Sequence, residues 1–140
     1  MNPVKNNNIL ILGASSQIGN DLALCFSKNN SLVLLGRKTN RLHKTSAECL
    51  LAGALHVEVI VQDLANDDDI FFQKIVDKQF DLIINLVATT SRVKDSDLFL
   101  NQLEKYVSSD LIVPIKLIQL LASKSIKPLK IIYISSILAS

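Results

Sequence analysis

The chain has 140 residues, 49% of them hydrophobic, with 15 Lys and Arg against 13 Asp and Glu. The apolar share is too high and the net charge of +2 too small for a disordered segment. A charge so close to balance, with no dense basic stretch, gives no electrostatic case for nucleic-acid binding. The length suits one domain, so we expect a single globular domain over residues 1–140.

Two features bear on the compartment. No segment reaches the roughly 18 uninterrupted apolar residues of a membrane-spanning helix, and the N-terminal apolar run is shorter than the core of about 7–15 residues that a signal peptide needs. Cys25 and Cys49 have neither CxxC spacing nor a nearby His, so we expect two buried free thiols and no metal site. The sequence therefore predicts a cytoplasmic protein that does not enter a membrane.

Short apolar runs alternate with segments of helical periodicity along the chain. The runs predicted as strands are Ile9–Leu12, Leu32–Leu35, 55–61, Leu82–Val87 and Leu129–Ser135. The segments predicted as helices are Gln17–Lys28, Asn40–Ala52, a helix that starts at Asn66, and Leu98–Ser123. Gly53 is a natural stop for the second helix, and Pro114 predicts a kink near Leu111 in the last one.

The predicted strands are apolar throughout rather than alternating, which is typical of parallel strands buried on both faces. Alternation of strands and helices then favours a doubly wound, Rossmann-like α/β sheet of about five strands. In such sheets ligands bind at the carboxyl ends of the strands. Candidate functional residues are therefore sought directly after each strand.

The first strand is followed by Gly13-Ala14-Ser15-Ser16-Gln17-Ile18-Gly19. Gly13 allows a sharp turn, the small residues after it let a pyrophosphate approach the backbone, and Gly19 lets the helix pack close to the sheet. The same glycines would also suit a tight strand-to-helix turn without a ligand. Because the segment follows the first strand of an alternating fold, we favour a nucleotide site.

The second strand ends in Gly36-Arg37-Lys38. A carboxylate near this point usually binds the ribose 2′-hydroxyl of NAD, whereas an Arg accommodates the 2′-phosphate of NADP. Two cations and no acid occur here, which favours NADP. An exposed basic pair at the start of a helix is the alternative interpretation.

Polar residues also follow the later strands. Asp63 could accept a hydrogen bond from an adenine amino group or cap a turn. Asn85, inside an apolar strand, needs buried partners and could hold neighbouring loops together or border a ligand. Ser135 and Ser136 follow the fifth strand, where a hydroxyl could donate to a substrate carbonyl or satisfy a turn.

Together these motifs resemble the short-chain dehydrogenase/reductase family over almost the whole chain. The segment 12–19 is similar to the family's Thr-Gly-x-x-x-Gly-Ile-Gly loop, although Leu12 stands for Thr and Gln17 for the middle glycine. The strand 81–88 is similar to Asp-x-x-x-Asn-Asn-Ala-Gly at Asp81 and Asn85. The resemblance implies a cofactor site formed by Gly13, Ser15, Ser16, Gln17, Ile18, Gly19, Arg37, Lys38, Asp63, Leu64, Asn85 and Ala88.

The resemblance also implies catalytic positions. Ser136 matches the serine that binds and polarises the substrate carbonyl, and Asp110 aligns with an Asn that holds a water near the catalytic lysine. The family's acid is the tyrosine of Tyr-x-x-x-Lys, which lies beyond that serine. Neither Tyr106 nor Tyr133 is followed by Lys four residues later. The chain is thus expected to stop short of this motif.

Two hypotheses follow. The chain is the N-terminal part of an NADP-preferring reductase or dehydrogenase that acts on a carbonyl or hydroxyl substrate, which the sequence does not identify. Alternatively, it is a catalytically inert module that binds NAD(P). A flavodoxin-like or receiver domain is disfavoured, because no acidic pair follows the first strand. Five strands without further cover would leave an apolar surface, so self-association is also expected.

Overall fold

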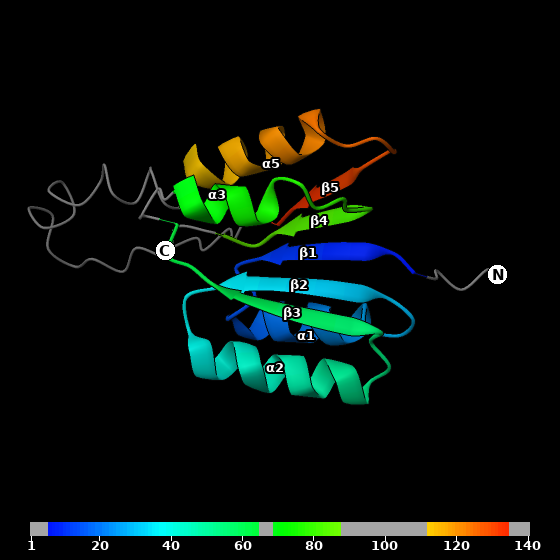
Figure 1. Ribbon diagram of the computed structural model, residues 1–140. Helices are drawn as coiled ribbons and strands as arrows, with labels where there is room; N and C mark the ends of the chain where they lie inside the picture. Colours follow the sequence, from blue (N-terminus) through cyan, green and yellow to red (C-terminus); the bar gives the residue numbers. More distant parts are fainter. Residues whose placement is uncertain (1–5, 65–68, 88–111, 135–140) are drawn as a thin grey trace, which may run out of the picture.

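The computed structural model describes residues 6–64, 69–87 and 112–134, in which strands and helices alternate along the chain (Figure 1). The strands are β1 (Asn8–Leu12), β2 (Ser31–Gly36), β3 (His56–Val61), β4 (Leu82–Asn85) and β5 (Lys130–Tyr133). The helices are α1 (Gln17–Cys25), α2 (Thr39–Leu51), α3 (Asp69–Ile75) and α5 (Val113–Ser123). The predicted order of elements is confirmed.

The five strands form one sheet in the order β3-β2-β1-β4-β5, and every neighbouring pair is parallel. The chain first builds outward from β1 to β2 and β3, and then crosses back to add β4 and β5 on the other side. The order therefore reverses at β1, which lies between β2 and β4. This reversal is the topological switch point at which doubly wound sheets bind their ligands.

Helices cover both faces of the sheet, with α1 and α2 on one face and α3 and α5 on the other (Figure 1). Successive residues of β1 point to opposite faces, so Leu10 and Leu12 pack with Leu117 of α5, while Ile9 and Ile11 belong to the cluster on the α1 and α2 face. These four of the five β1 side chains are at most 2% exposed. Burial on both faces explains why β1 is apolar without alternation.

The two cysteines lie in different surroundings. Cys49 of α2 is fully buried, and this burial raises the pKa of its thiol, with a hydrogen bond to Ser27 acting in the opposite direction. The prediction of a buried thiol is wrong for Cys25, which is exposed. The buried residues of α1 are Gly19 and Ala23, and a residue two positions after Ala23 points away from that face.

The ends of two helices illustrate the roles of glycine and proline. Gly53 has a φ of +106° directly after α2, and Ala54 N–H donates to the Cys49 carbonyl at 3.0 Å, which confirms Gly53 as the expected stop. Pro114 lies in the first turn of α5 (Val113–Ser123), a position that tolerates its missing N–H. The kink expected near Leu111 falls outside the described residues.

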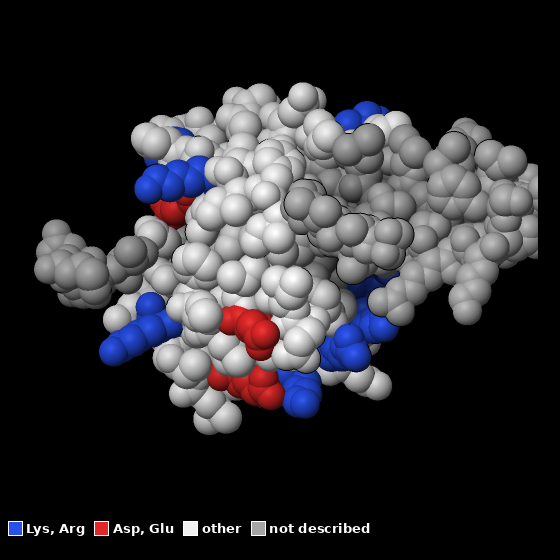
Figure 2. All heavy atoms as spheres, turned by 180° about the vertical axis from the view of Figure 1, so that it is seen from behind, with Lys and Arg blue, Asp and Glu red and all other residues white. Residues whose placement is uncertain are grey.

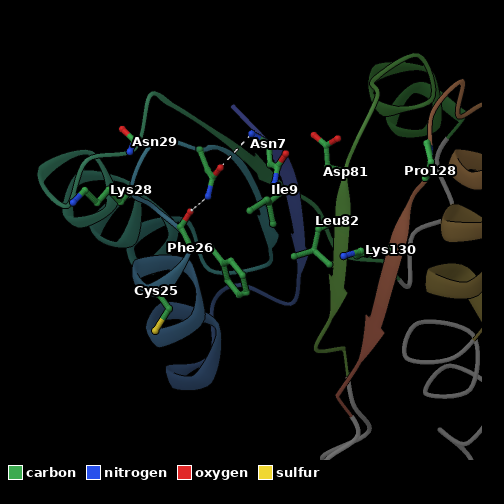
Figure 3. Close-up of a pocket in the computed structure, with 11 residues that line it drawn as sticks. Asn7, Ile9, Cys25, Phe26, Lys28, Asn29, Asp81, Leu82, Pro128 and Lys130 are labelled. Carbon is green, nitrogen blue, oxygen red and sulfur yellow. Dashed lines mark hydrogen bonds between the residues drawn. The ribbon is translucent and has the colours of Figure 1, made fainter. Parts of the chain in front are cut away.

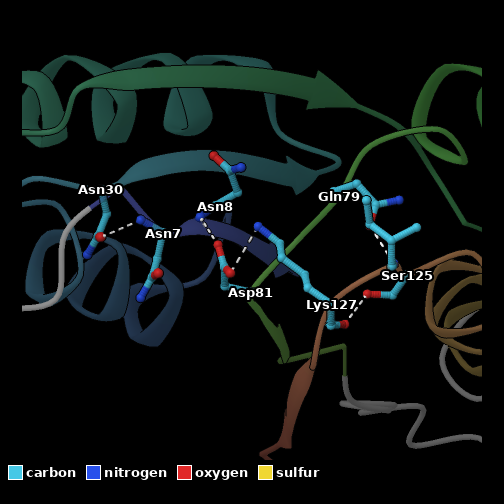
Figure 4. Close-up of polar contacts among 8 residues, drawn as sticks. Asn7, Asn8, Asn30, Gln79, Asp81, Ser125 and Lys127 are labelled. Atoms are coloured by element: carbon cyan, nitrogen blue, oxygen red, sulfur yellow. Dashed lines mark hydrogen bonds and ion pairs between the residues drawn. The ribbon is translucent and has the colours of Figure 1, made fainter.

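Asp81 ties together the amino ends of three strands (Figure 4). Its carboxylate accepts a hydrogen bond from Asn8 N–H of β1 at 2.8 Å and pairs with Lys127 Nζ, just before β5, at 3.0 Å. Its backbone N–H donates to the Asn8 carbonyl, and its own carbonyl accepts from Lys130 N–H. Asp81 therefore fixes the start of β4 between its two neighbours.

Replacing Asp81 by Ala should lower the free energy of unfolding by about 1–2 kcal/mol, because the partly buried Asn8 N–H loses its side-chain acceptor. Lys127→Ala removes only the half-exposed ion pair and should cost less than about 1 kcal/mol. Urea denaturation of the two variants measures the difference. Equal losses would contradict a clamp that depends on the Asn8 hydrogen bond.

Candidate functional site

The segments after β1, β2 and β4 meet at the carboxyl edge of the sheet. Gly13 N–H and Ala14 N–H both donate to the Leu35 carbonyl of β2, each at 2.9 Å. On the other side, Leu86 N–H donates to the Leu12 carbonyl at 2.8 Å. These bonds continue the parallel ladders past the strand ends, so the loop after β1 lies between the two neighbouring loops.

Gly13 makes the sharp turn that leaves β1. Its φ is +85°, which disfavours residues with a side chain, and a Cβ added there would lie 3.1 Å from Leu86 C and Val87 N. The turn is therefore close-packed against the chain that follows β4. The sequence prediction of a sharp turn at Gly13 agrees with this geometry.

Gly19 brings α1 against the loop that precedes it. A Cβ at this position would lie 2.8 Å from both Cα and O of Ala14, and these backbone atoms have no freedom to move aside. Gly19 and Ala14 are both fully buried or nearly so. The close approach of helix and loop thus requires glycine at position 19, as the nucleotide-loop interpretation expects.

Ser16 caps α1. Its hydroxyl accepts a hydrogen bond from Gly19 N–H at 3.0 Å and donates to the Gly13 carbonyl at 3.3 Å. Within the described residues, the backbone N–H groups of Ser15, Ser16, Gln17 and Ile18 have no acceptor. Four such groups at a helix N-terminus, together with the positive end of the helix dipole, form an arrangement that suits a phosphate.

Gln17 and Ile18 are exposed at the start of α1. Gln17 Nε2 donates to Asp21 Oδ1, one helical turn further on, at 3.1 Å. This bond directs the Gln17 side chain along the helix. The residue that replaces the middle glycine of the family loop therefore has a local partner of its own.

A second contact joins the glycine loop to the chain after β2. Gly36 is buried, and a Cβ added there would collide with Ser15 Oγ. Ser15 Oγ also accepts a hydrogen bond from Lys38 N–H at 3.3 Å. A side chain at the third glycine of the site would therefore displace the Ser15 hydroxyl from its contact with Lys38 N–H.

Arg37 and Lys38 are exposed immediately after β2, beside Ser15. Figure 2 shows a group of Lys and Arg side chains on this side of the molecule, next to the grey residues. None of the cations Arg37, Lys38 and Arg41 forms an ion pair with a carboxylate in the part of the chain that is described. The end of β2 is thus a cationic surface beside the four loop N–H groups.

Arg41 is the residue of this surface that sequence reasoning missed. It lies in the first turn of α2, and its Nη1 donates to the Ser15 carbonyl at 3.2 Å. The partner is a backbone carbonyl 26 positions earlier in the chain, and no pattern in the sequence indicates this contact.

The remaining predicted positions differ in their surroundings. Asp63 is half-buried after β3, whereas Leu64 is 5% exposed and belongs to the core cluster on the α5 face. Asn85 is 6% exposed, and its Oδ1 accepts from Val87 N–H at 3.0 Å, so it fixes the turn after β4. Ala88, Asp110 and Ser136 lie outside the described residues.

A hollow of about 930 Å³ lies at the opposite, amino end of the sheet (Figure 3). It is lined by the end of α1, with Cys25 and Phe26, and by residues at the start of β4 and β5, including Leu82 and Lys130. None of the residues that the sequence assigned to a cofactor lines it. The hollow and the cationic surface are therefore separate features.

Neither a membrane-spanning helix nor a metal-binding cluster occurs in residues 6–64, 69–87 and 112–134. Over these ranges, no helix is both long enough and apolar enough to cross a membrane. Nor do three or more His, Cys, Asp or Glu side chains gather there in a way that could hold a metal ion.

Comparisons with known proteins bear on this fold and site. Residues 9–139 match the model of the NAD dependent epimerase/dehydratase family. Among curated proteins, 11-beta-hydroxysteroid dehydrogenase-like 5 of Arabidopsis thaliana is 39% identical over 62 residues, which are 44% of this chain and 16% of that protein.

Solved structures share the fold at low sequence identity. A short-chain dehydrogenase/reductase variant from Serratia marcescens has a TM-score of 0.79 and 19% identity, over 97% of this chain and 58% of that one. A Salmonella enterica short chain dehydrogenase has a TM-score of 0.72 and 18% identity, over 97% and 62%. L-Sorbose reductase from Gluconobacter frateurii, complexed with NADPH and L-sorbose, has a TM-score of 0.70 and 20% identity, over 86% and 48%.

The chain thus spans less than two thirds of each of these relatives. The family match extends over most of the sequence and includes the glycine loop and the end of β2. The expected resemblance to short-chain dehydrogenases/reductases is confirmed, because the chain has their Rossmann-like fold and belongs to the NAD dependent epimerase/dehydratase family.

Proposed function

We propose that this chain binds NADPH in preference to NADH and forms the cofactor-binding part of a short-chain dehydrogenase/reductase. The observation that carries the proposal is the pairing of two features at one edge of the sheet. Four loop N–H groups without an acceptor lie beside an exposed cationic surface that no carboxylate neutralises in the described structure. The loop N–H groups suit a pyrophosphate, and the cationic surface suits a 2′-phosphate. NADP contains both of these groups.

The positions of these residues support such a cofactor site. The N–H groups of residues 15–18 would receive the pyrophosphate, and the close packing at Gly13 and Gly19 opens the approach to them. Arg37 and Lys38 would neutralise the 2′-phosphate, and Asp63 after β3 would face the adenine. Asn85 supports this edge by holding the turn after β4.

The reaction follows from the cofactor, which when bound supplies a hydride to a carbonyl or accepts one from an alcohol. In the full-length protein, Ser136 would bind and polarise the substrate carbonyl, with Asp110 at the position of a water-holding Asn. We further propose that the protein acts in the cytoplasm. The substrate is a small molecule of undetermined identity.

A catalytically inert NAD(P)-binding module is the second candidate. Its support is that neither Tyr106 nor Tyr133 is followed by Lys four residues later. NADPH fluorescence enhancement measures binding, and NADPH oxidation with a panel of aldehydes and ketones measures turnover. Binding with turnover excludes the inert module, and a coding frame that continues into Tyr-x-x-x-Lys favours the dehydrogenase/reductase. Failure to bind either dinucleotide contradicts both candidates.

Arg37→Asp should shift the cofactor preference from NADPH towards NADH. The variant loses a charge-assisted contact of about 1.5–3 kcal/mol, which corresponds to about a 10- to 100-fold weaker NADPH complex. Calorimetric titration with both dinucleotides measures the ratio of dissociation constants. The control is Lys28→Asp, which makes the same charge change at an exposed residue of the loop between α1 and β2, at the other end of the sheet. It should leave the ratio of dissociation constants unchanged. Unaltered NADPH affinity in Arg37→Asp would show that Arg37 does not bind the 2′-phosphate.

Self-association is a further part of the proposal. Ile132 and Tyr133 of β5 are 43% and 55% exposed, and β5 is the last strand of the described sheet. An exposed apolar edge strand favours pairing with another chain. Light scattering should therefore show a mass above 15.4 kDa that rises with concentration, and Ile132→Lys should lower it. A monomer at every concentration would contradict this part.

A further inference from the structure

The first turn of α2 contradicts the usual preferences of a helix N-terminus. Lys38 occupies the N-cap position without a side-chain capping bond, and the first turn contains no acidic residue. Arg41 instead adds a cation at the positive end of the helix dipole, where a carboxylate would be more stable. Residues that violate a local preference in this way are expected where function requires them.

Arg41 makes one contact that explains its position. Its Nη1 donates to the Ser15 carbonyl at 3.2 Å, and no other partner of Arg41 is found in the described structure. Ser15 is held from the same side by its hydroxyl, which accepts from Lys38 N–H. The carbonyl oxygen and the hydroxyl oxygen of Ser15 thus both accept hydrogen bonds from residues at the start of α2.

The position of α2 itself is set by a separate bond. Thr45 of α2 is 3% exposed, and its Oγ1 donates to Asn20 Oδ1 of α1 at 2.6 Å. Because this bond lies one turn after Arg41, the helix that carries Arg41 is tied to the helix that begins at the glycine loop. The guanidinium is therefore presented to Ser15 by a fixed support.

Holding the Ser15 carbonyl has a consequence for the next N–H group. The peptide unit is planar, and in its trans form the carbonyl of one residue and the N–H of the next point in opposite directions. A Ser15 carbonyl fixed towards Arg41 therefore fixes Ser16 N–H on the opposite side. Ser16 N–H is one of the four groups without an acceptor at the start of α1.

We propose that Arg41 is a positioning residue that orients the glycine loop for the pyrophosphate, rather than a third contact of the 2′-phosphate. The inference rests on the proposed dinucleotide site. It separates two roles within one cationic surface: Arg37 distinguishes NADPH from NADH, and Arg41 strengthens the binding of both equally.

Arg41→Met should weaken NADPH and NADH by the same factor of about 3 to 10, which is the range expected for the loss of one ordinary exposed hydrogen bond. Arg41→Lys retains a donor and should recover part of the loss. Arg37→Met should weaken NADPH alone. Lys44→Met removes an exposed cation from the next turn of α2 and should affect neither dinucleotide beyond a small change from the lost charge.

A second measurement uses the protein without cofactor. In amide NMR spectra, Arg41→Met should shift the resonance of Ser16 and its neighbours in the loop, whereas Arg37→Met should not. Unfolding in urea should be nearly unchanged, because Arg41 is exposed.

The outcomes are distinguishable. Loss of NADPH affinity alone in Arg41→Met, or no loss with either dinucleotide, would overturn the positioning role. If the wild-type chain binds neither dinucleotide, the proposed function fails, and the Ser16 shift then decides the positioning role by itself. An unshifted Ser16 resonance in Arg41→Met overturns that role in every case.

Discussion

The candidate site depends on the close contact between the loop after β1 and the chain after β2. Gly13 N–H and Ala14 N–H share the Leu35 carbonyl, and Ser15 lies directly against Gly36. A side chain at Gly36 would displace the Ser15 hydroxyl, and the approach of α1 allows no side chain at Gly19. The three glycines therefore serve one purpose, which is to bring two loops and a helix end to a single place.

That contact also combines two local charge arrangements into one site. The N–H groups of residues 15–18 that have no acceptor in the described structure attract an anion, and Arg37, Lys38 and Arg41 repel one another at the start of α2. Cations at the positive end of a helix dipole are unfavourable by themselves. The proposed dinucleotide has negative charge at both places, so it would offset the repulsion among these cations and accept hydrogen bonds from the loop N–H groups.

Much of the fold could be predicted from the sequence, because strands buried on both faces are apolar throughout and glycines mark their ends. The order of strands and helices along the chain, the turn at Gly13 and the stop at Gly53 follow from these local rules. Cys25 was mispredicted because helical periodicity does not state how wide the buried stripe is, and that of α1 contains only Gly19 and Ala23. Arg41 was missed because its partner is a backbone carbonyl 26 positions earlier, which no sequence pattern reveals.

The most direct test of the account is an NMR titration of the isotopically labelled chain with NADPH. The account predicts that amide shifts concentrate in residues 13–19 and 36–41, at the carboxyl edge of the sheet. It predicts little change around the amino-end hollow, where Asp81 and Lys130 lie. Shifts confined to that hollow, or no shifts at saturating NADPH, would contradict the central claim that the two glycine-bounded loops form the dinucleotide site.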